Sequence, residues 1–203
     1  MLRVLVIALV ALVAALMLLP RPGPGAGPVA ATLLDAPRPL PDVALTDADG
    51  APFRLDDLAG RHTLVFFGFT NCPDICPITL SVIADAIAAL RTEGPGREPA
   101  VLFVSVDPKR DSPARIRAYV DAFDPAFIGA TADEAALAPL LEALAVSVHK
   151  QVLGEETYNV VHNGTIYVLD DEARWIGLFG GSTHEAGTIV GDYLAIRARA
   201  AAG

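Results

Sequence analysis

Two short, continuous apolar runs constrain the fold of this chain more than any other feature. "HTLVFFGFT" (62–70) and "AVLFVSVD" (100–107) consist almost entirely of β-branched, aromatic and other apolar residues. Runs of this length and composition predict strands buried at the centre of a sheet. The segment "ITLSVIADAIAALR" (78–91) lies between them and carries apolar residues at helical spacing, which predicts a helix.

The rest of the chain continues this alternation. Further predicted elements are a short strand and turn at 43–50, helices at 112–123, 131–146 and about 183–200, and strands at 158–170 and 174–180. Ser112 is expected to cap the second helix, with Pro113 in its first turn, and Thr131 and Glu134 have the spacing of a capping box. The order of elements predicts an α/β fold, with a mixed central sheet and helices on both faces.

The N-terminal region predicts export. Residues 1–19, "MLRVLVIALVALVAALMLL", place Arg3 before sixteen uncharged, mostly apolar residues. We therefore expect 1–20 to be a membrane anchor or a cleaved signal, which sends the rest of the chain across the membrane. Residues 21–40 are rich in Pro, Gly and Ala without periodicity and predict a tether. The folded domain is expected over 41–203.

Composition narrows the class of partner. Of the 203 residues, 53% are hydrophobic and 19% charged, which is typical of a globular domain rather than a disordered chain. The net charge of −9, with no cluster of Lys and Arg, argues against a nucleic-acid partner. Two cysteines are too few for a disulfide scaffold, so they are expected to form a site.

The two cysteines, Cys72 and Cys76, lie in "GFTNCPDICP" (68–77), where a predicted buried strand ends and a helix begins. In open α/β folds, ligands and active-site residues lie at the carboxyl ends of the strands, which is where this segment is predicted to be. Unpaired backbone N–H groups and the helix dipole favour the thiolate there. Three chemistries compete for the pair: a structural disulfide, a redox dithiol and a soft-metal chelate.

The spacing of the cysteines favours metal binding. Residues four apart on a helix have Cβ atoms about 5 to 6 Å apart, whereas a disulfide needs about 3.5 to 4.5 Å. A metal with two bonds of about 2.3 Å to sulfur spans the wider gap without strain. A reversible, redox-active disulfide between Cys72 and Cys76 in the metal-free protein remains an alternative.

Histidine is the natural third ligand. His162 interrupts an apolar strand and is the best candidate, whereas His62, His149 and His184 are expected to be structural. A site of two cysteines and one histidine suits copper, because thiolates favour Cu(I) and imidazole helps to hold Cu(II). Zinc accepts the same ligands, but its structural sites normally use four.

Four segments in order, "GFTNCPDICP", "VSVDPKRDSPARIRAYV", "YNVVHNGTIYVLD" and "GLFGG", resemble the Sco/SenC family over residues 40–198. These are membrane-tethered, copper-binding, thioredoxin-like proteins. The resemblance implies a thioredoxin-like fold and one copper ion bound by Cys72, Cys76 and His162. It also implies a role in delivering copper to, or reducing the thiols of, the dinuclear copper site of cytochrome c oxidase subunit II.

The chain departs from the family beside the histidine. The family commonly has an aspartate before it and a hydroxyl residue after it, where this chain has Val161 and Asn163. Hydrogen bonds from such neighbours orient a ligand and tune the metal. Asp74 and Asp107 are nearby carboxylates that either tune the metal or act as helix-capping and turn residues.

The sequence as a whole predicts a copper metallochaperone rather than a turnover enzyme. We expect it to take copper from a donor protein at the periplasmic face of the inner membrane. The alternative is a thiol-disulfide oxidoreductase that keeps the copper-ligand cysteines of the oxidase reduced. An ordinary thioredoxin has two residues between its cysteines and a facing proline, but this chain has three and no proline after Pro139. A thiol peroxidase usually has a threonine three positions before its cysteine, whereas Thr70 precedes Cys72 by two.

Overall fold

The computed structural model describes residues 30–94, 96–152, 158–181 and 184–200. The chain divides into two compact units. One unit, Val29–Asp192, contains the whole sheet, and the other comprises Met1–Pro28 and Tyr193–Gly203. The part of the second unit that the structure describes is the end of the last helix.

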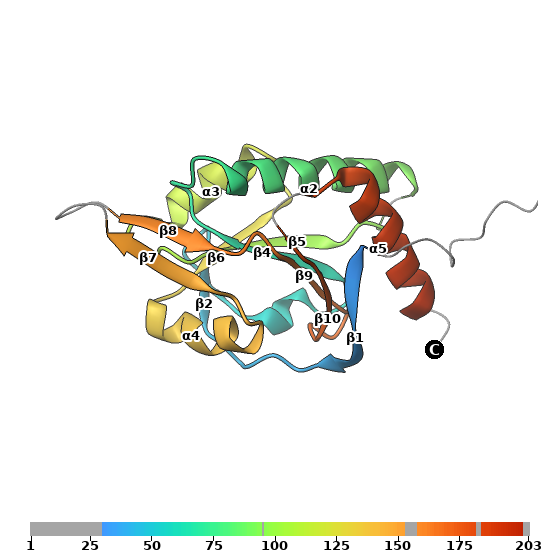
Figure 1. Ribbon diagram of the computed structural model, residues 1–203, viewed down its shortest axis with the longest axis horizontal. Coiled ribbons are helices and arrows are strands. Elements are labelled where there is room, and N and C mark those ends of the chain that lie inside the picture. Colours follow the sequence, from blue (N-terminus) through green and yellow to red (C-terminus); the bar gives the residue numbers. More distant parts are fainter. Residues whose placement is uncertain (1–29, 95, 153–157, 182–183, 201–203) are drawn as a thin grey trace, which may run out of the picture. The chain divides into compact units, whose positions relative to one another are not determined.

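An eight-stranded mixed sheet forms the larger unit (Figure 1). Across the sheet the strands are β1 (Ala31–Arg38), β10 (Trp175–Phe179), β9 (Ile166–Leu169), β4 (Thr63–Gly68), β5 (Ala100–Ser105), β6 (Ile128–Thr131), β2 (Leu45–Asp47) and β3 (Pro52–Phe53). Strands β4, β5 and β6 are parallel, and the other neighbours pair antiparallel. The helices are η1 (Leu55–Leu58), α2 (Ile75–Thr92), α3 (Pro113–Asp121), α4 (Glu134–Ala143) and α5 (Ala186–Ala200).

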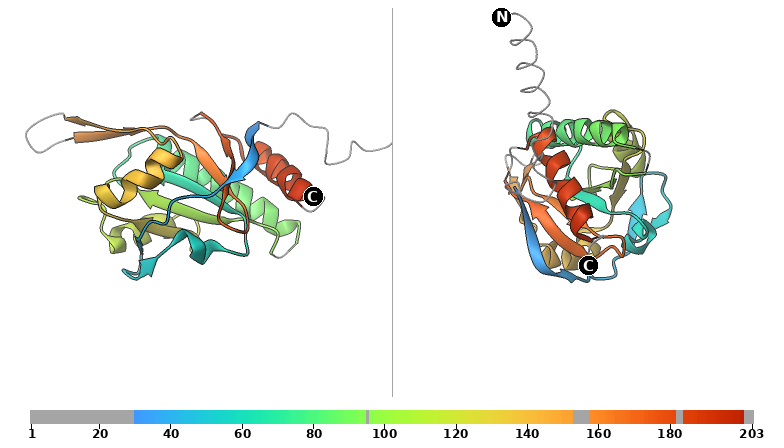
Figure 2. Two further views of the ribbon diagram at one scale, coloured as in Figure 1. Left: turned by 90° about the horizontal axis from the view of Figure 1, so that it is seen from below. Right: turned by 90° about the vertical axis from the view of Figure 1, so that its right-hand side faces the viewer.

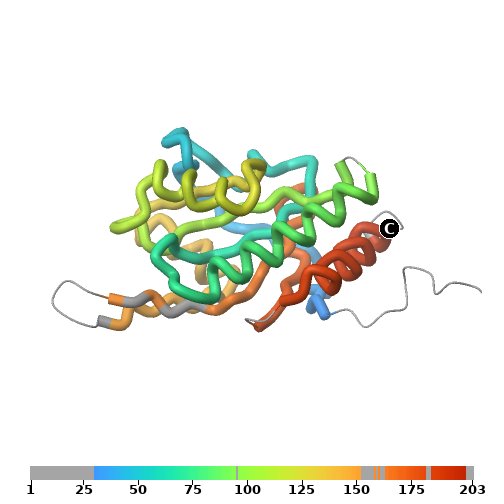
Figure 3. Tube along the Cα trace, turned by 90° about the horizontal axis from the view of Figure 1, so that it is seen from above, coloured from blue at the N-terminus to red at the C-terminus, as the bar shows by residue number. Residues whose placement is uncertain are grey.

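The two apolar runs form the centre of this sheet, as predicted. Every residue of β4 and β5 is buried, and the strands pair in parallel, with Phe66 opposite Phe103. Helices α2 and α3 cover one face of the sheet and α4 lies on the other (Figures 1 and 3). Helix α2 contributes an apolar stripe that is fully buried, including Leu80, Ile83 and Leu90. The predicted α/β class, with a mixed sheet and helices on both faces, is confirmed.

Several strands were not expected from the sequence, among them β1 and β6. Strand β1 occupies residues assigned to the tether, so Ala31–Arg38 belongs to the sheet, where Ala31 pairs with Phe179. Strand β6 is only four residues long and contains Gly129. A Cβ atom at Gly129 would lie 2.4 Å from Cγ2 of Ile116, so glycine permits α3 to pack closely there. Both strands are defined by their neighbours rather than by a local pattern.

The predicted helix caps have different outcomes. Helix α3 begins at Pro113, and Oγ of Ser112 accepts a hydrogen bond from the Arg115 amide at 3.3 Å, as expected. The capping box at Thr131 and Glu134 is wrong. Thr131 ends β6 and donates its hydroxyl to a backbone carbonyl, while α4 begins at Glu134 without a side-chain cap. The pairing of β6 in the sheet therefore overrides the local capping signal.

The predicted strand at 158–170 is two strands. Strand β8 (Tyr158–His162) pairs antiparallel with β7 (Val148–Val152) in a separate two-stranded sheet, and β9 joins the main sheet. We call β7 and β8 the ribbon. Figure 2 shows it extending beyond the main sheet. The short connection through Asn163 and Gly164 lets the chain change direction between the two sheets.

The predicted anchor at 1–20 lies outside the described residues, as do residues 21–29 of the predicted tether. Within the described ranges, α2 alone is long and apolar enough to cross a membrane by length and composition. However, seven residues of α2 are buried against the sheet, so it is the core helix of the fold.

Candidate metal centre

Both cysteines lie at the junction of β4 and α2. Cys72 is in the loop after β4, and Cys76 is the second residue of α2. The two cysteines do not form a disulfide with each other. The backbone N–H of Cys76 donates a hydrogen bond to the Sγ atom of Cys72, with 3.4 Å between nitrogen and sulfur. The fold therefore brings the two cysteines together at the N-terminus of a helix, as the sequence predicted.

The Cys72 sulfur occupies the place of a helix cap. Asp74 is at the N-cap position, yet it is exposed and its side chain makes no capping hydrogen bond. The sulfur of Cys72 instead accepts from the second amide of the helix, one of the groups that a capping side chain normally satisfies. Negative charge is favoured at this end of a helix. The local structure thus suits a thiolate at Cys72.

The two thiols have different environments. Cys72 is half-buried, whereas Cys76 is fully buried, with its Sγ atom beside Gly68 at the end of β4. A hydrogen bond between the side chains of the two cysteines, together with burial, raises the pKa of the Cys76 thiol far above its ordinary value. Cys76 therefore keeps its proton in the metal-free protein, and Cys72 is the accessible sulfur. Burial and the two sulfurs also raise the pKa of the Tyr119 hydroxyl.

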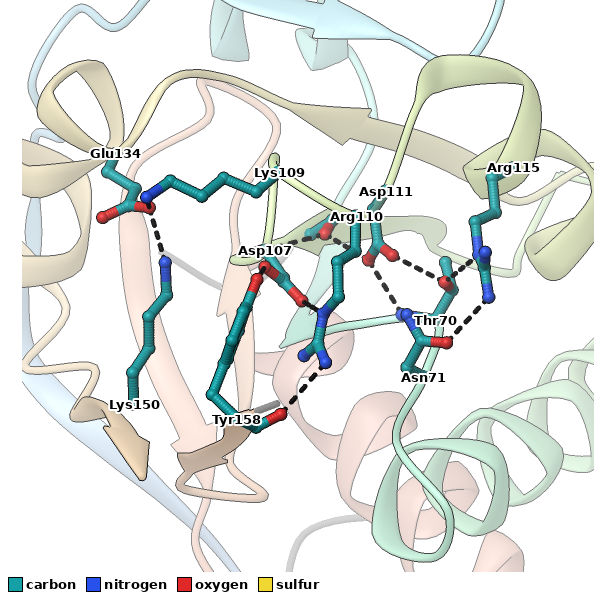
Figure 4. A network of polar contacts seen from close by, with 11 residues as sticks. Thr70, Asn71, Asp107, Lys109, Arg110, Asp111, Arg115, Glu134, Lys150 and Tyr158 are labelled. Carbon is teal, nitrogen blue, oxygen red and sulfur yellow. Dashed lines mark hydrogen bonds and ion pairs between the residues drawn. The ribbon is translucent and has the colours of Figure 1, made fainter. Parts of the chain in front are cut away.

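Asp111 holds the cysteine loop to the neighbouring strand. Its carboxylate accepts hydrogen bonds from the Thr70 amide at 2.8 Å, the Thr70 hydroxyl at 2.6 Å and the Ser105 hydroxyl at 2.6 Å. Arg115 then donates to the Thr70 hydroxyl at 2.8 Å and to Oδ1 of Asn71 at 2.7 Å (Figure 4). These contacts fix the residues directly before Cys72.

Asp107 serves the other side of the site. It is fully buried, pairs with Arg110 and accepts a hydrogen bond from the Tyr158 hydroxyl at 2.6 Å. Tyr158 is the first residue of β8, so Asp107 connects the loop after β5 to the ribbon (Figure 4). The structure therefore gives Asp107 a supporting role for the ribbon, which the sequence did not predict.

His162, the predicted third ligand, is the last residue of β8. Its backbone pairs with Val148 of β7. Its side chain lies outside the described part of the structure, and so does that of Val161. Within the described part, no cluster of three His, Cys, Asp or Glu residues is arranged to hold a metal. The role of His162 as a ligand therefore stays a prediction.

Two other histidines have contacts of their own. His149 is exposed on β7, and its ring bonds the Ser147 hydroxyl at 2.9 Å. His184 precedes α5, and its Nε2 atom lies 2.8 Å from the carbonyl oxygen of Gly164. Gly164 belongs to the connection between β8 and β9, so His184 supports the turn that follows His162.

Sequence reasoning missed most of the supporting residues, including Asp111, Arg110 and Tyr158. A signal for them was present in "DPKRD" (107–111), which places two aspartates four apart directly after a buried strand. Of these two, only Asp107 was predicted to matter, as a carboxylate that either tunes the metal or acts as a turn residue. The loop instead contacts both halves of the candidate site, through Asp111 on the cysteine side and Asp107 on the ribbon side.

The mixed sheet and the two thiols at the end of its central strand define a thioredoxin-like protein with a dithiol site. Comparison with known proteins then gives the family. The SCO1/SenC family model matches residues 35–195, and the chain belongs to this family.

Individual relatives agree with this assignment. A curated SCO2-like protein of Rickettsia felis is 32% identical over 141 residues, covering 68% of this chain and 67% of the relative. The copper-bound crystal structure of Arabidopsis thaliana ScoI is 30% identical, with a TM-score of 0.72 over 78% of this chain and 98% of that one. The solution structure of apo Sco1 from Thermus thermophilus is 34% identical, with a TM-score of 0.73 over 82% of this chain and 96% of that one.

Proposed function

We propose that this protein binds one copper ion and passes it on as a metallochaperone in the assembly of the dinuclear copper site of cytochrome c oxidase. The observation that carries the proposal is the meeting of two reduced cysteines at the start of α2, where the sulfur of Cys72 lies 3.4 Å from the Cys76 amide. The proposed ligands are Cys72, Cys76 and His162. The ion is cargo, so binding must be both selective and reversible.

The donor chemistry fits copper. Thiolates are the soft ligands that Cu(I) prefers, and an imidazole helps to hold Cu(II). Metal binding requires deprotonated thiols, and the helix N-terminus favours negative charge on both sulfurs once the proton of Cys76 is lost. Copper at the site therefore competes with the proton that Cys76 holds in the metal-free protein.

The difference in exposure between the thiols suggests an order of events. Cys72 is half-buried and accessible, so it makes the first bond to an incoming ion and the last bond to a departing one. Cys76 is buried and completes the chelate from within the fold. Three protein ligands leave room for a thiol of the donor or acceptor protein, which allows transfer by ligand exchange.

Several relatives support the proposal. The solved Arabidopsis relative contains copper, and another solved neighbour, 20% identical, is a member of the Sco family of cytochrome c oxidase assembly proteins. We extend these properties to this chain and propose subunit II of the oxidase as acceptor and an unidentified copper-donor protein as source. We also propose that residues 1–20 anchor the chain to the membrane, with the site on the exported, periplasmic side.

Copper titration of the reduced, full-length chain in a mild detergent tests the ligand set. We expect the wild-type protein to bind one copper ion, with a thiolate-to-Cu(II) absorption band and a Cu(II) paramagnetic resonance spectrum. The variants Cys72→Ser and Cys76→Ser are expected to lose the band, and His162→Ala to bind more weakly with an altered spectrum. His149→Ala, on the neighbouring strand, is the matched control and should behave as wild type. Equal binding by His162→Ala and wild type would refute the three-ligand set.

A second candidate function is reduction of the oxidase cysteines, and the unequal thiols favour it. An accessible Cys72 beside a buried Cys76 can attack a disulfide of the partner and then release it through Cys76. The two thiols of this protein become a disulfide, the partner disulfide becomes two thiols, and two electrons and two protons are transferred. Absence of copper binding by wild-type protein, with reduction of a disulfide in a peptide of the subunit II copper loop, would favour this function over the metallochaperone.

A further inference from the structure

We infer that Arg110 is a positioning residue that joins the cysteine loop to the ribbon and thereby sets where β8 lies relative to the two thiols. The inference rests on the proposed ligand set, because β8 ends at His162. A site built from a loop and a separate ribbon needs a contact that fixes one against the other. Arg110 has contacts to both.

The guanidinium group of Arg110 lies near two aromatic rings. Its central carbon is 3.9 Å from the centroid of the Tyr158 ring, on β8, and 5.8 Å from the centroid of the Phe69 ring. The carbonyl of Phe69 accepts the hydrogen bond of the Cys72 amide at 3.2 Å, so Phe69 is part of the turn that presents Cys72. Cations over aromatic faces attract the ring, and arginine stacks on such faces particularly well. One side chain therefore touches both halves of the site.

Hydrogen bonds fix the direction of this side chain. Nη1 of Arg110 donates to the Tyr158 carbonyl at 3.0 Å, and Nε pairs with the carboxylate of Asp107. Asp107 is itself immobile, because it is fully buried and also accepts from the Tyr158 hydroxyl at 2.6 Å. Arg110 and Asp107 thus hold Tyr158 by its ring, its hydroxyl and its backbone carbonyl (Figure 4).

The ribbon needs such support. An isolated two-stranded sheet is marginally stable in water, and β7 and β8 pair with each other rather than with the main sheet. A second polar contact of the ribbon with the body joins Lys150 to Glu134, at 2.5 Å, where Glu134 is half-exposed. Exposed ion pairs of this kind contribute little. The contacts at Tyr158 therefore restrain β8 more strongly than this ion pair does.

The ion pair of Arg110 and Asp107 is better explained as selecting one position of β8 than as adding to the stability of the fold. A buried ion pair repays its desolvation cost only when the geometry is good, and its best-documented use is to select one arrangement of the chain. Here the planar fork of Arg110 satisfies a carboxylate and a backbone carbonyl from two segments at once. An apolar residue would fill the same volume without fixing the direction of β8.

The test combines copper binding with a double-variant cycle on the full-length chain. Arg110→Gln is made in the wild-type and the His162→Ala backgrounds. If Arg110→Gln alone is unstable, the double variant Asp107→Asn/Arg110→Gln replaces it, because it leaves no buried carboxylate without its cation. Arg174→Gln is the matched control, because Arg174 also pairs with a largely buried aspartate, Asp170, but at the β9–β10 turn.

Arg110→Gln is expected to weaken copper binding about 10- to 100-fold, the usual cost of losing a residue that orients a ligand. Its Cu(II) resonance spectrum should approach that of His162→Ala. In the His162→Ala background the same change should have no further effect beyond roughly twofold, since it acts through that histidine. In metal-free protein, hydrogen exchange of β7 and β8 amides should accelerate while β4 and β5 stay protected. Arg174→Gln should leave copper affinity and spectrum unchanged.

Three results would overturn the inference. An unchanged affinity in Arg110→Gln, when His162→Ala is clearly weakened, would refute it while leaving the ligand set intact. An equal loss in both backgrounds would mean that Arg110 acts on the fold in general rather than through His162. Wild-type binding by His162→Ala would refute the ligand set and the inference with it.

Discussion

Gly68→Ala tests how closely the cysteine helix packs on the central strand. Gly68 is the last residue of β4, and a Cβ atom built there would lie 2.7 Å from Cε2 of Phe103 and 3.1 Å from Sγ of Cys76. The first distance is about 0.7 Å shorter than the 3.4 Å at which ordinary contact begins. We therefore expect the substitution to overpack the core directly beneath the buried thiol.

The surroundings give little freedom to relax. Phe103 is fully buried on β5, with its ring 6.4 Å from that of Phe66 and 5.5 Å from that of Tyr119. Overpacking of a close-packed core costs about 1 to 3 kcal/mol. Replacing glycine by alanine also lowers the conformational entropy of the unfolded chain, which raises the free energy of unfolding by about 0.4 to 1 kcal/mol. The expected net loss in the free energy of unfolding lies between about 0 and 2.6 kcal/mol, centred near about 1.3 kcal/mol.

Urea unfolding of the reduced, metal-free chain measures this loss. Gly180→Ala is the matched control, because Gly180 directly follows β10 and its Cβ would meet only Cδ1 of Leu178, at an ordinary 3.6 Å. Gly180→Ala restricts the unfolded chain in the same way but without the clash, so it should leave the free energy of unfolding unchanged or raise it by up to about 1 kcal/mol. If the two variants had the same stability, Gly68 would not be required by packing and the reasoning would be refuted.

Three further predictions concern the support of the site, its acid stability and its thiols. In Asp111→Ala the Thr70 amide and the Ser105 hydroxyl lose their acceptor, which should lower the free energy of unfolding by about 1 to 3 kcal/mol for each. Urea unfolding measures this loss, and a total below about 1 kcal/mol would contradict the prediction. Burial acts to raise the pKa of Asp124, but the hydrogen bond from Arg91 outweighs it and holds the pKa below its ordinary value. The stability that this ion pair contributes is therefore present above about pH 4 and lost as the pH falls. In Arg91→Gln, the free energy of unfolding should fall less steeply with decreasing pH than in wild type. Parallel curves of unfolding free energy against pH for the two proteins would refute this. The two thiols are compared one at a time by alkylation followed by mass spectrometry. Cys72 in the Cys76→Ser variant should react much faster than Cys76 in the Cys72→Ser variant, since burial and a raised pKa protect Cys76. Equal rates would contradict the predicted difference between the thiols.

The sequence by itself determined the centre of the fold and the location of the dithiol. Strands β4 and β5 and helix α2 follow from continuous burial and helical spacing, which are local properties of the chain. The place of Cys72 and Cys76 at the end of β4 follows from the same pattern, because a motif directly after a buried strand must lie at the edge of the sheet.

Only the tertiary structure decided the supporting contacts and the remaining strands. Strand β1 lies in a stretch without periodicity and exists because β10 provides hydrogen bonds for it. The hydrogen bonds that Thr70 donates to Asp111 and that Tyr158 donates to Asp107 join residues 41 and 51 positions apart. The unequal burial of the two thiols likewise depends on what packs around α2. Hydrogen bonds and packing between distant segments depend on their positions in space, which no local pattern specifies.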